Sequence, residues 1–164
     1  MIRFLKNQTV HEIQELDPNT SVLDYLREQL CLPGTKEGCA SGDCGTCTIV
    51  LGEPASNGIR YKAVNACLLP IGTLHGKQLI TVEDLSSRKV LHPAQQVIVE
   101  HHASQCGFCT PGCVMSMFAL QKNNPLPDRQ NIVDALGGNI CRCTGYEPIV
   151  DAILEASRNT RGAA

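Results

Sequence analysis

Cysteines are the residues whose type and spacing in this sequence point to chemistry. Ten of the 164 residues are cysteines, and Cys39, Cys44, Cys47 and Cys67 follow the spacing C-x4-C-x2-C-x19-C. This is the ligand spacing of plant-type [2Fe–2S] centres, in which three thiolates on one loop and a fourth from a distant segment hold both irons. A zinc site fits less well, because structural zinc sites use paired C-x2-C knuckles and this set contains only one. We therefore predict an iron-sulfur centre here.

Glycines around these cysteines support the same interpretation. Gly38, Gly42 and Gly45 lie within the loop, and glycine lets the backbone adopt a positive φ and turn its N–H groups inward. A [2Fe–2S] centre with four thiolates is a dianion that gains a further negative charge on reduction. Hydrogen bonds from N–H groups to sulfur offset that charge and help to set the potential.

A second set of four cysteines has a spacing that leaves its metal open. Cys106, Cys109, Cys141 and Cys143 follow C-x2-C-x31-C-x-C, and four thiolates hold zinc as well as iron. Both pairs stand just ahead of a predicted helix, one from residue 111 and one from residue 147. Two helix N-termini directed at one place favour an anionic cluster. We expect a second [2Fe–2S] centre, with zinc as the alternative.

Cys31 and Cys113 belong to neither set. Cys113 lies in a predicted helix among apolar residues, so we expect a small buried side chain there and no ligand. Cys31 follows a predicted helix and receives the same interpretation. The N-terminus has no apolar run typical of a signal peptide. We therefore expect a cytoplasmic chain with reduced thiols.

Charge and motif content exclude several functions. The chain has 14 Lys and Arg against 16 Asp and Glu, a formal net charge of −2, which argues against nucleic-acid binding. No stretch approaches the roughly 20 apolar residues of a membrane span. The sequence contains neither G-x-G-x-x-G nor a P-loop, and no catalytic acid, base or nucleophile stands out. The chain is expected to conduct electrons and to leave bond chemistry to a partner.

The sequence pattern in the first half of the chain predicts a small sheet crossed by one helix. Ser21 is a predicted N-cap for a helix over 22–30, which Pro33-Gly34 ends. Lys6-Asn7-Gln8 predicts a hairpin turn, and Gly52-Glu53-Pro54 and Ser56-Asn57-Gly58 predict further turns. Strands are predicted at 2–5, 9–15, 48–51, 59–66 and 79–82.

The hydrophobic period changes from two to about 3.6 near residues 83–90. Four helices are predicted beyond that point, with start signals at Pro93, Thr110-Pro111, Asp128 and Pro148. They form a small helical bundle. The sequence therefore predicts an α+β chain of two domains, residues 1–84 and 85–164, each with one [2Fe–2S] centre.

Five motifs together resemble the iron-sulfur part of one enzyme family. They are Gly34-Thr35-Lys36-Glu37-Gly38-Cys39 with its continuation to Cys47, Asn65-Ala66-Cys67-Leu68, Thr73-Leu74-His75-Gly76-Lys77, Gln105 to Gly112, and Gly138 to Tyr146. The chain resembles the molybdenum hydroxylases over nearly its whole length, and within them it is most similar to xanthine dehydrogenase.

The resemblance implies a plant-ferredoxin-like β-grasp domain followed by a four-helix bundle domain. Electrons from substrate hydroxylation at a molybdopterin centre would pass to the second cysteine set, then to the first set, to FAD and to NAD. Gln105 would hydrogen-bond the pterin, and the Cys143 sulfur would contact the pterin amine. The implied partners are a molybdopterin-binding large chain and an FAD-binding chain or domain, in a hetero-oligomer.

Two departures from the family pattern leave all ligands in place. Cys113 stands where a larger apolar residue such as Phe is usual, and Glu147 stands where Arg is common. Three other interpretations remain: the iron-sulfur small subunit of a sister aldehyde or N-heterocycle hydroxylase, a free-standing ferredoxin-type carrier, and a zinc-stabilised interaction module. A free carrier needs no second centre and is expected to have a strongly acidic docking surface.

Overall fold

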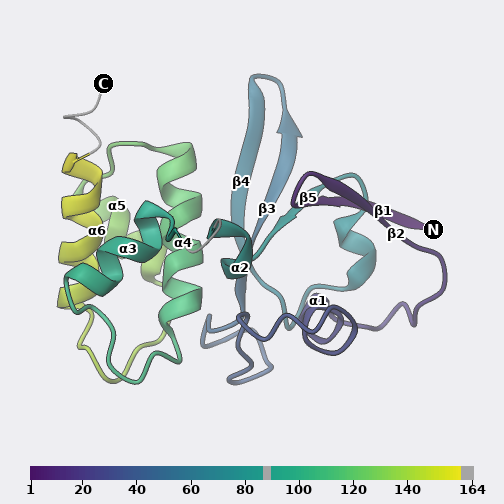
Figure 1. Ribbon diagram of the computed structural model, residues 1–164, viewed down its shortest axis with the longest axis horizontal. Coiled ribbons are helices and arrows are strands. Elements are labelled where there is room, and N and C mark those ends of the chain that lie inside the picture. Colours follow the sequence, from purple (N-terminus) through teal and green to yellow (C-terminus); the bar gives the residue numbers. More distant parts are fainter. Residues whose placement is uncertain (87–89, 160–164) are drawn as a thin grey trace.

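The structure is a computed structural model that describes residues 1–86 and 90–159. Within these ranges, five strands form one mixed sheet in the order β2-β1-β5-β3-β4, in which only the β1–β5 pair is parallel. Helices α3 to α6 gather on one side of the β3–β4 hairpin, and the N-terminal strands lie on the other side together with α1 (Figure 1). The elements are β1 (Ile2–Lys6), β2 (Thr9–Ile13), α1 (Val22–Asp24), η1 (Tyr25–Gln29), β3 (Thr48–Ala55), β4 (Gly58–Asn65), η2 (Ile71–Leu74), β5 (Gln78–Ile80), α2 (Val82–Leu85), α3 (Pro93–Glu100), α4 (Thr110–Asn123), α5 (Arg129–Leu136) and α6 (Glu147–Asn159).

The sheet separates two hydrophobic cores, and alternate residues of the central strands supply them. Side chains along a strand point to opposite faces in turn. Val50 and its partner Ile80 pack with the helices α3 to α6. Leu51 and its partner Leu79 pack instead with α1 and η1. One short strand pair thus contributes to both cores.

Several predicted elements are confirmed. The β1–β2 hairpin turns at Asn7 and Gln8, whose φ values of +49° and +64° suit a tight hairpin turn. The predicted helix over 22–30 is present as α1, capped by Ser21, and continues as the π-helical turn η1. Helices α3 to α6 begin within one residue of their predicted starts.

Two predictions at the ends of strands are wrong. Gly52, Glu53 and Pro54 do not turn, because β3 continues through them and pairs with β4 up to Ala55. The strand β5 pairs with β3 only at residues 50–52, so Pro54 has a neighbour on one side only, where a residue without an N–H group is tolerated. Val82 is not the end of a strand but the first residue of α2.

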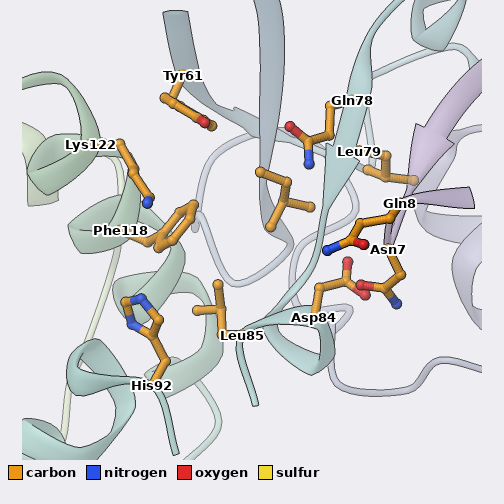
Figure 2. A pocket seen from close by; sticks show the side chains of 11 residues that line it. Asn7, Gln8, Tyr61, Gln78, Leu79, Asp84, Leu85, His92, Phe118 and Lys122 are labelled. Atoms are coloured by element: carbon orange, nitrogen blue, oxygen red, sulfur yellow. The ribbon is translucent and has the colours of Figure 1, made fainter. Parts of the chain in front are cut away.

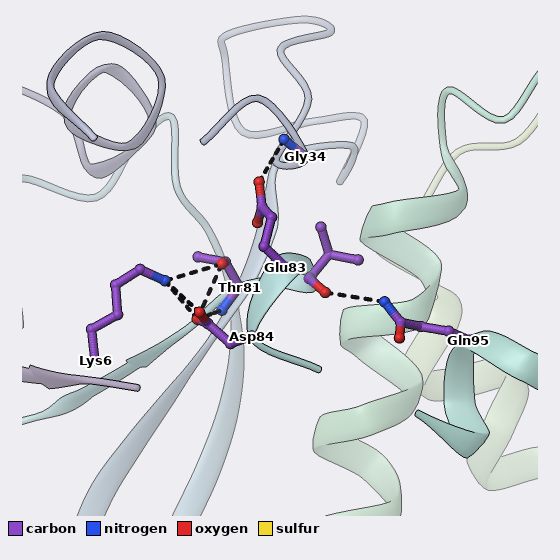
Figure 3. A network of polar contacts seen from close by, with 7 residues as sticks. Lys6, Gly34, Thr81, Glu83, Asp84 and Gln95 are labelled. Carbon is purple, nitrogen blue, oxygen red and sulfur yellow. Dashed lines mark hydrogen bonds and ion pairs between the residues drawn. The ribbon is translucent and has the colours of Figure 1, made fainter. Parts of the chain in front are cut away.

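The short helix α2 connects three parts of the molecule (Figure 3). Asp84 and Thr81 accept hydrogen bonds from the Lys6 ammonium of β1 at 2.6–3.2 Å. Glu83 accepts the Gly34 amide at 2.7 Å, and the Val82 carbonyl accepts the Gln95 side chain of α3 at 3.1 Å. The change of hydrophobic period predicted near residues 83–90 therefore falls at this hydrogen-bonded junction. Residues 87–89 lie outside the described ranges.

A second junction joins the loop before β3 to the segment after α5. The Gly45 carbonyl accepts the Asn139 side-chain amide at 2.9 Å, and Ser116 of α4 donates to the Asn139 oxygen at 2.6 Å. The Ile140 amide donates to the Cys44 carbonyl at 2.9 Å. This approach requires glycine, because a Cβ atom on Gly45 would lie 2.0 Å from the Gly138 carbonyl oxygen.

In the part of the chain that the structure describes, none of the helices has both the length and the apolar character needed to cross a bilayer.

The Lys6–Asp84 ion pair is nearly buried, with side chains 4% and 7% exposed. We expect Lys6→Met to lower the free energy of unfolding by about 3–5 kcal/mol, because it leaves the Asp84 carboxylate buried without its cation. Urea unfolding of the purified protein, followed by circular dichroism, measures this loss. Arg3→Met is the matched control: the Arg3–Glu12 pair is 53% and 45% exposed, and its loss should cost less than about 1 kcal/mol. Equal costs for the two variants would contradict the assignment.

We expect Gly45→Ala to weaken the junction between the two loops. Both Gly45 and Gly76 have positive φ, +67° and +74°, but a Cβ on Gly76 would meet nothing within 4 Å. Gly76→Ala should therefore cost only the backbone strain of about 1–2 kcal/mol. Gly45→Ala should cost about 1–3 kcal/mol more, because its methyl group collides with backbone. The same urea titration compares the two variants, and similar midpoints would show that the close approach is not required.

Candidate metal centres

The loop that carries Cys39 and Cys44 turns its backbone N–H groups toward sulfur. The amides of Ser41, Asp43 and Cys44 donate to the Cys39 sulfur at 3.3–3.4 Å. The Cys39 amide donates to the Cys44 sulfur at 3.4 Å. The turn passes through Gly42 at a φ of +76°, which glycine adopts readily. Two sulfur atoms thus receive four backbone N–H groups.

These donors lower the pKa of the Cys39 thiol. A hydrogen bond with the Ser41 side chain, followed by those from the amides of Cys44, Ser41 and Asp43, brings the pKa from 9.0 to about 6. Donors of this kind stabilise the charged form of a thiol. The loop is therefore suited to a thiolate, which is the form of cysteine that ligates metals.

Cys47 and Cys67 are brought together by the ends of two paired strands. Cys47 directly precedes β3 and Cys67 follows β4, and the Ala66 amide donates to the Cys47 carbonyl at 3.2 Å. Burial is the main cause that raises the pKa of Cys47 to about 11, and the Cys67 thiol is its hydrogen-bond partner. A coordinated cation removes the proton from such a thiol, because its charge stabilises the thiolate where water cannot.

Cys106 and Cys143 form the exposed half of the second set. Their sulfur atoms lie 3.4 Å apart, although the residues are 37 positions apart in the sequence. The Phe108 amide is the main cause that lowers the pKa of Cys106. The hydrogen bond with Cys106 raises the pKa of Cys143. The Cys143 thiol is therefore the donor and the Cys106 sulfur the acceptor of this pair.

Cys109 and Cys141 form the inner half of this set, with their thiols hydrogen-bonded to each other. Burial is the main cause that raises the pKa of Cys109. Burial also opposes ionisation of Cys141, but hydrogen bonds from the hydroxyl and the amide of Thr144 outweigh it and lower the pKa. The Cys141 amide donates to the Tyr146 hydroxyl at 2.9 Å, which fixes the turn around the sulfur.

Two helices begin beside the second set, as the sequence predicts. Helix α4 begins at Thr110, directly after Cys109, and α6 begins at Glu147, four residues after Cys143. Helix N-termini carry partial positive charge, so both starts favour a negatively charged group nearby. Glu147 forms an ion pair with Arg129 of α5. The carboxylate at the start of α6 is therefore already paired with a cation.

The thiols are arranged in pairs, and this arrangement fits two-iron centres. Within residues 1–86 and 90–159, no three His, Cys, Asp or Glu side chains are grouped to hold a single metal ion. A [2Fe–2S] centre takes four thiolates for two irons, two on each iron. The contacting pairs are Cys39 with Cys44, Cys47 with Cys67, Cys106 with Cys143, and Cys109 with Cys141.

Gln105 lies at the surface beside the exposed half of the second set. Phe108 and Ile140, from the same two loops, are 48% and 50% exposed. Sequence analysis does not single out Phe108 and Ile140, because their exposure depends on how the two loops fold back.

Asn139 is a further site residue to which the sequence motif assigns no role. Its side chain is buried and joins the Gly45 carbonyl to Ser116. The only sequence signal is a polar residue between Gly138 and the apolar Ile140. That signal predicts a buried amide poorly, since the three side-chain partners of Asn139, namely Gly45, Thr48 and Ser116, come from distant segments.

The two remaining cysteines differ from each other. Cys113 is buried in α4, as predicted. The prediction for Cys31 is wrong, because its side chain is exposed. Cys31 has a φ of +52° where the chain leaves η1, and the Leu32 amide turns back to the Leu26 carbonyl at 2.9 Å. This left-handed helix end directs the Cys31 side chain to solvent.

A cavity of about 310 Å³ lies apart from both cysteine sets (Figure 2). Tyr61 of β4, Gln78 of β5 and Phe118 of α4 are among its lining residues. The Lys122 ammonium lies 5.3 Å from the centre of the Phe118 ring. Burial, with a smaller effect of Lys122, lowers the pKa of His92. The described lining residues include no thiol.

Family models match both halves of the chain. The model described as "2Fe-2S iron-sulfur cluster binding domain" matches residues 4–71, and the model described as "[2Fe-2S] binding domain" matches residues 81–154. The second match favours iron over zinc for the second set, which spacing alone left open.

Several known proteins are similar to this chain over most of its length. Aldehyde oxidase 1 of Rattus norvegicus is 49% identical over 155 residues, 93% of this chain but only 12% of that protein. The chain thus spans about an eighth of the length of this relative. Quinoline 2-oxidoreductase from Pseudomonas putida 86 has a solved chain that is 35% identical, with a TM-score of 0.83, covering 98% of this chain and 95% of that one. Aldehyde oxidoreductase from Desulfovibrio gigas has a TM-score of 0.87 at 35% identity, covering 100% of this chain and 18% of that one.

The likeness to the quinoline 2-oxidoreductase chain runs through almost the full length of both molecules. The α+β fold is that of ferredoxin-like [2Fe–2S] domains, and both regions that carry the cysteine sets match [2Fe–2S]-binding models. The chain belongs to the iron-sulfur segments of the molybdenum hydroxylases and is the [2Fe–2S] part of an oxidoreductase.

Proposed function

We propose that this chain relays electrons from a molybdopterin centre to FAD within a larger hydroxylase. One centre is held by Cys39, Cys44, Cys47 and Cys67, and the other by Cys106, Cys109, Cys141 and Cys143. Each bound [2Fe–2S] centre supplies a one-electron acceptor and donor. The observation that carries the proposal is that each set of four thiols meets in two close pairs, and that a backbone hydrogen bond joins the segments that carry the two sets.

That hydrogen bond is the one between the Ile140 amide and the Cys44 carbonyl, at 2.9 Å. Cys44 belongs to the first set, and Ile140 directly precedes Cys141 of the second set. The bond therefore links the backbone at or next to one cysteine of each set. Asn139 and Gly45 hold the same two segments together from the adjoining positions. The loops that carry the two centres therefore keep a fixed relative position.

The exposed side of the second set is proposed to face the molybdopterin chain. Cys106 and Cys143 are exposed together with Gln105. Gln105 would hydrogen-bond the pterin through its side-chain amide, and the Cys143 sulfur would contact the pterin amine. Cys39 is exposed in the first set and marks the side from which electrons would leave toward FAD and NAD. The resulting assembly is a hetero-oligomer or a multidomain chain.

Two domains are proposed to hold these centres. Residues 1–84 would form a β-grasp domain, and residues 85–164 a four-helix bundle domain. The packing of α3 to α6 in one hydrophobic core, and of α1 and η1 in another on the opposite face of the sheet, supports this division, and β3 and β5 contribute to both cores. Residues 87–89 and 160–164 lie outside the described ranges.

The candidate substrates of the whole enzyme are a purine, an aldehyde and an N-heterocycle. The sequence motifs favour xanthine dehydrogenase, whereas aldehyde oxidases and a quinoline 2-oxidoreductase are among the relatives found. Assays of the purified enzyme with xanthine, benzaldehyde and quinoline, each with NAD and with oxygen as acceptor, separate these candidates. Turnover of xanthine with NAD would support the first.

Metal and flavin analysis tests the relay directly. We expect about four Fe per copy of this chain in the complex purified from its native host, because two [2Fe–2S] centres require them. About one Mo and one FAD should accompany them. Iron without Mo or FAD would indicate a free-standing carrier. Zinc in place of iron would contradict electron transfer altogether.

Substitution of single ligands tests the order of the relay. Cys143→Ser should alter the electron paramagnetic resonance signal of one centre and stop reduction of FAD by substrate, while reduction of FAD by NADH survives. Cys44→Ser should alter the signal of the other centre. Cys31→Ser is the matched control, because Cys31 is an exposed cysteine outside both sets, and it should change neither signal. Normal reduction of FAD by substrate in Cys143→Ser would contradict the proposed order.

A further inference from the structure

The cavity of about 310 Å³ in Figure 2 is built from both halves of the chain. Its walls come from the β1–β2 turn, β4, β5, α2, the residue before α3, and α4. Leu79 belongs to the hydrophobic core of the N-terminal part, whereas Ile80, Leu85 and Phe118 belong to the helical core. A volume of this size is at the lower end of the range for small-molecule sites. The cavity thus has room for a compact ligand at the place where the two cores meet.

One positive charge in the wall of this cavity has no counter-charge. The Lys122 ammonium lies 5.3 Å from the centre of the Phe118 ring, and a cation–π interaction favours this position. Lys122 takes part in none of the ion pairs between the described residues. The Asp84 carboxylate also lines the cavity, but Lys6 neutralises it. The described lining residues therefore have a net positive charge, which favours an anionic ligand.

His92 adds a hydrogen-bond donor beside Lys122. Its Nδ1 atom accepts the Ala94 amide at 3.1 Å and caps α3. A neutral imidazole that accepts at one nitrogen carries its proton on the other, and burial lowers the pKa of His92. Within the described ranges, the side-chain hydrogen bond of His92 is the one at Nδ1. Figure 2 shows the ring directed toward Phe118, with the ring centres 5.4 Å apart. The Nε2–H group is therefore free to donate to an anion.

Amide and apolar side chains complete the wall. Gln8 and Gln78 lie on the side of the cavity opposite Phe118 (Figure 2), and their amide groups can donate or accept hydrogen bonds. Three apolar side chains, each 6–8% exposed, lie in the same wall: Ile80, Leu85 and Phe118. An inorganic anion would leave these apolar groups without contacts. The wall therefore suits a ligand with a negative charge at one end and an apolar body.

We propose that this cavity binds a small aromatic carboxylate. The carboxylate pairs with the Lys122 ammonium and accepts the Nε2–H group of His92, in hydrogen bonds that charge strengthens. The ring packs against Ile80, Leu85 and Phe118. The site is independent of the proposed electron relay, because the described lining residues include no cysteine. A ligand bound here contacts the sheet and the helices together, so it stabilises the folded arrangement of both.

Benzoate is the probe that tests this site. Titration of the purified complex with benzoate, followed by saturation-transfer difference NMR of the ligand, gives the dissociation constant. Lys122→Met removes the charge and keeps an unbranched side chain, and we expect binding about 10- to 100-fold weaker. Lys62→Met is the matched control. Lys62 follows Tyr61 on β4, so its side chain points to the opposite face of the sheet, where it pairs with Glu53, and its loss should leave the affinity unchanged.

Two further probes separate the contributions of charge and ring. Benzamide has the shape of benzoate without its charge, and acetate has the charge without the ring. Both should bind at least about tenfold more weakly than benzoate, because each lacks one of the two kinds of contact. Equal affinity of the wild-type complex for benzamide and benzoate would overturn the proposal, and so would the absence of benzoate binding.

A benzoate site elsewhere in the complex is common to the wild type and to Lys122→Met, so only the difference between the two reports on the cavity. Equal benzoate binding by these two proteins would overturn the proposal. His92→Asn keeps a side chain that caps a helix well but lacks the imidazole donor, and it should weaken binding severalfold. Unchanged affinity in His92→Asn would contradict the hydrogen bond assigned to Nε2. Lys122 is exposed, so its variant should keep the circular dichroism spectrum of the wild type.

Discussion

The position of both cysteine sets depends on one carbonyl group. The Gly45 oxygen accepts the Asn139 side chain at 2.9 Å and the hydroxyl and amide of Thr48 at 2.6 and 3.1 Å. Three donors on one acceptor are possible only because no Cβ stands in the way: a Cβ on Gly112 would lie 2.3 Å from this oxygen. The first loop, the start of α4 and the segment before Cys141 therefore meet at one point, and any change there moves ligands of both sets.

The proposed ligands combine exposed and buried thiols, and this combination would couple metal binding to folding. Cys39, Cys106 and Cys143 are exposed, whereas Cys47 and Cys141 are buried. Exposed thiols are accessible to incoming iron. Buried thiols need a cation to stabilise their thiolate form, so their ionisation would depend on metal binding. The free energy of metal binding is in this way part of the free energy of folding.

The cysteine spacing carried most of the information about the site, whereas the contacts between distant segments could not be predicted. The spacing, the hairpin at Asn7 and the helix starts follow from local rules and are present in the structure. Local rules predict a turn at Pro54, because proline is tolerated in a strand only where its N–H side is unpaired. Whether that side is unpaired depends on how far β5 extends. The sequence predicts a buried Cys31, because no local sequence signal marks the left-handed end of η1 at this residue. The partners of the Asn139 side chain lie 23, 91 and 94 positions away in the sequence.

Both sets combine backbone and side-chain hydrogen bonds, and this combination affects how each set can be tuned. In the first set, backbone amides of the loop donate to Cys39 and Cys44, and the Ser41 side chain adds a hydrogen bond to Cys39. In the second set, the Phe108 amide is a hydrogen-bond partner of Cys106, and the hydroxyl and amide of Thr144 are partners of Cys141. A side-chain substitution leaves the amide donors in place as long as each loop keeps its shape. Substitution of Ser41 or of Thr144 therefore changes the surroundings of one set at a time, whereas the amide donors of both sets are fixed by the fold.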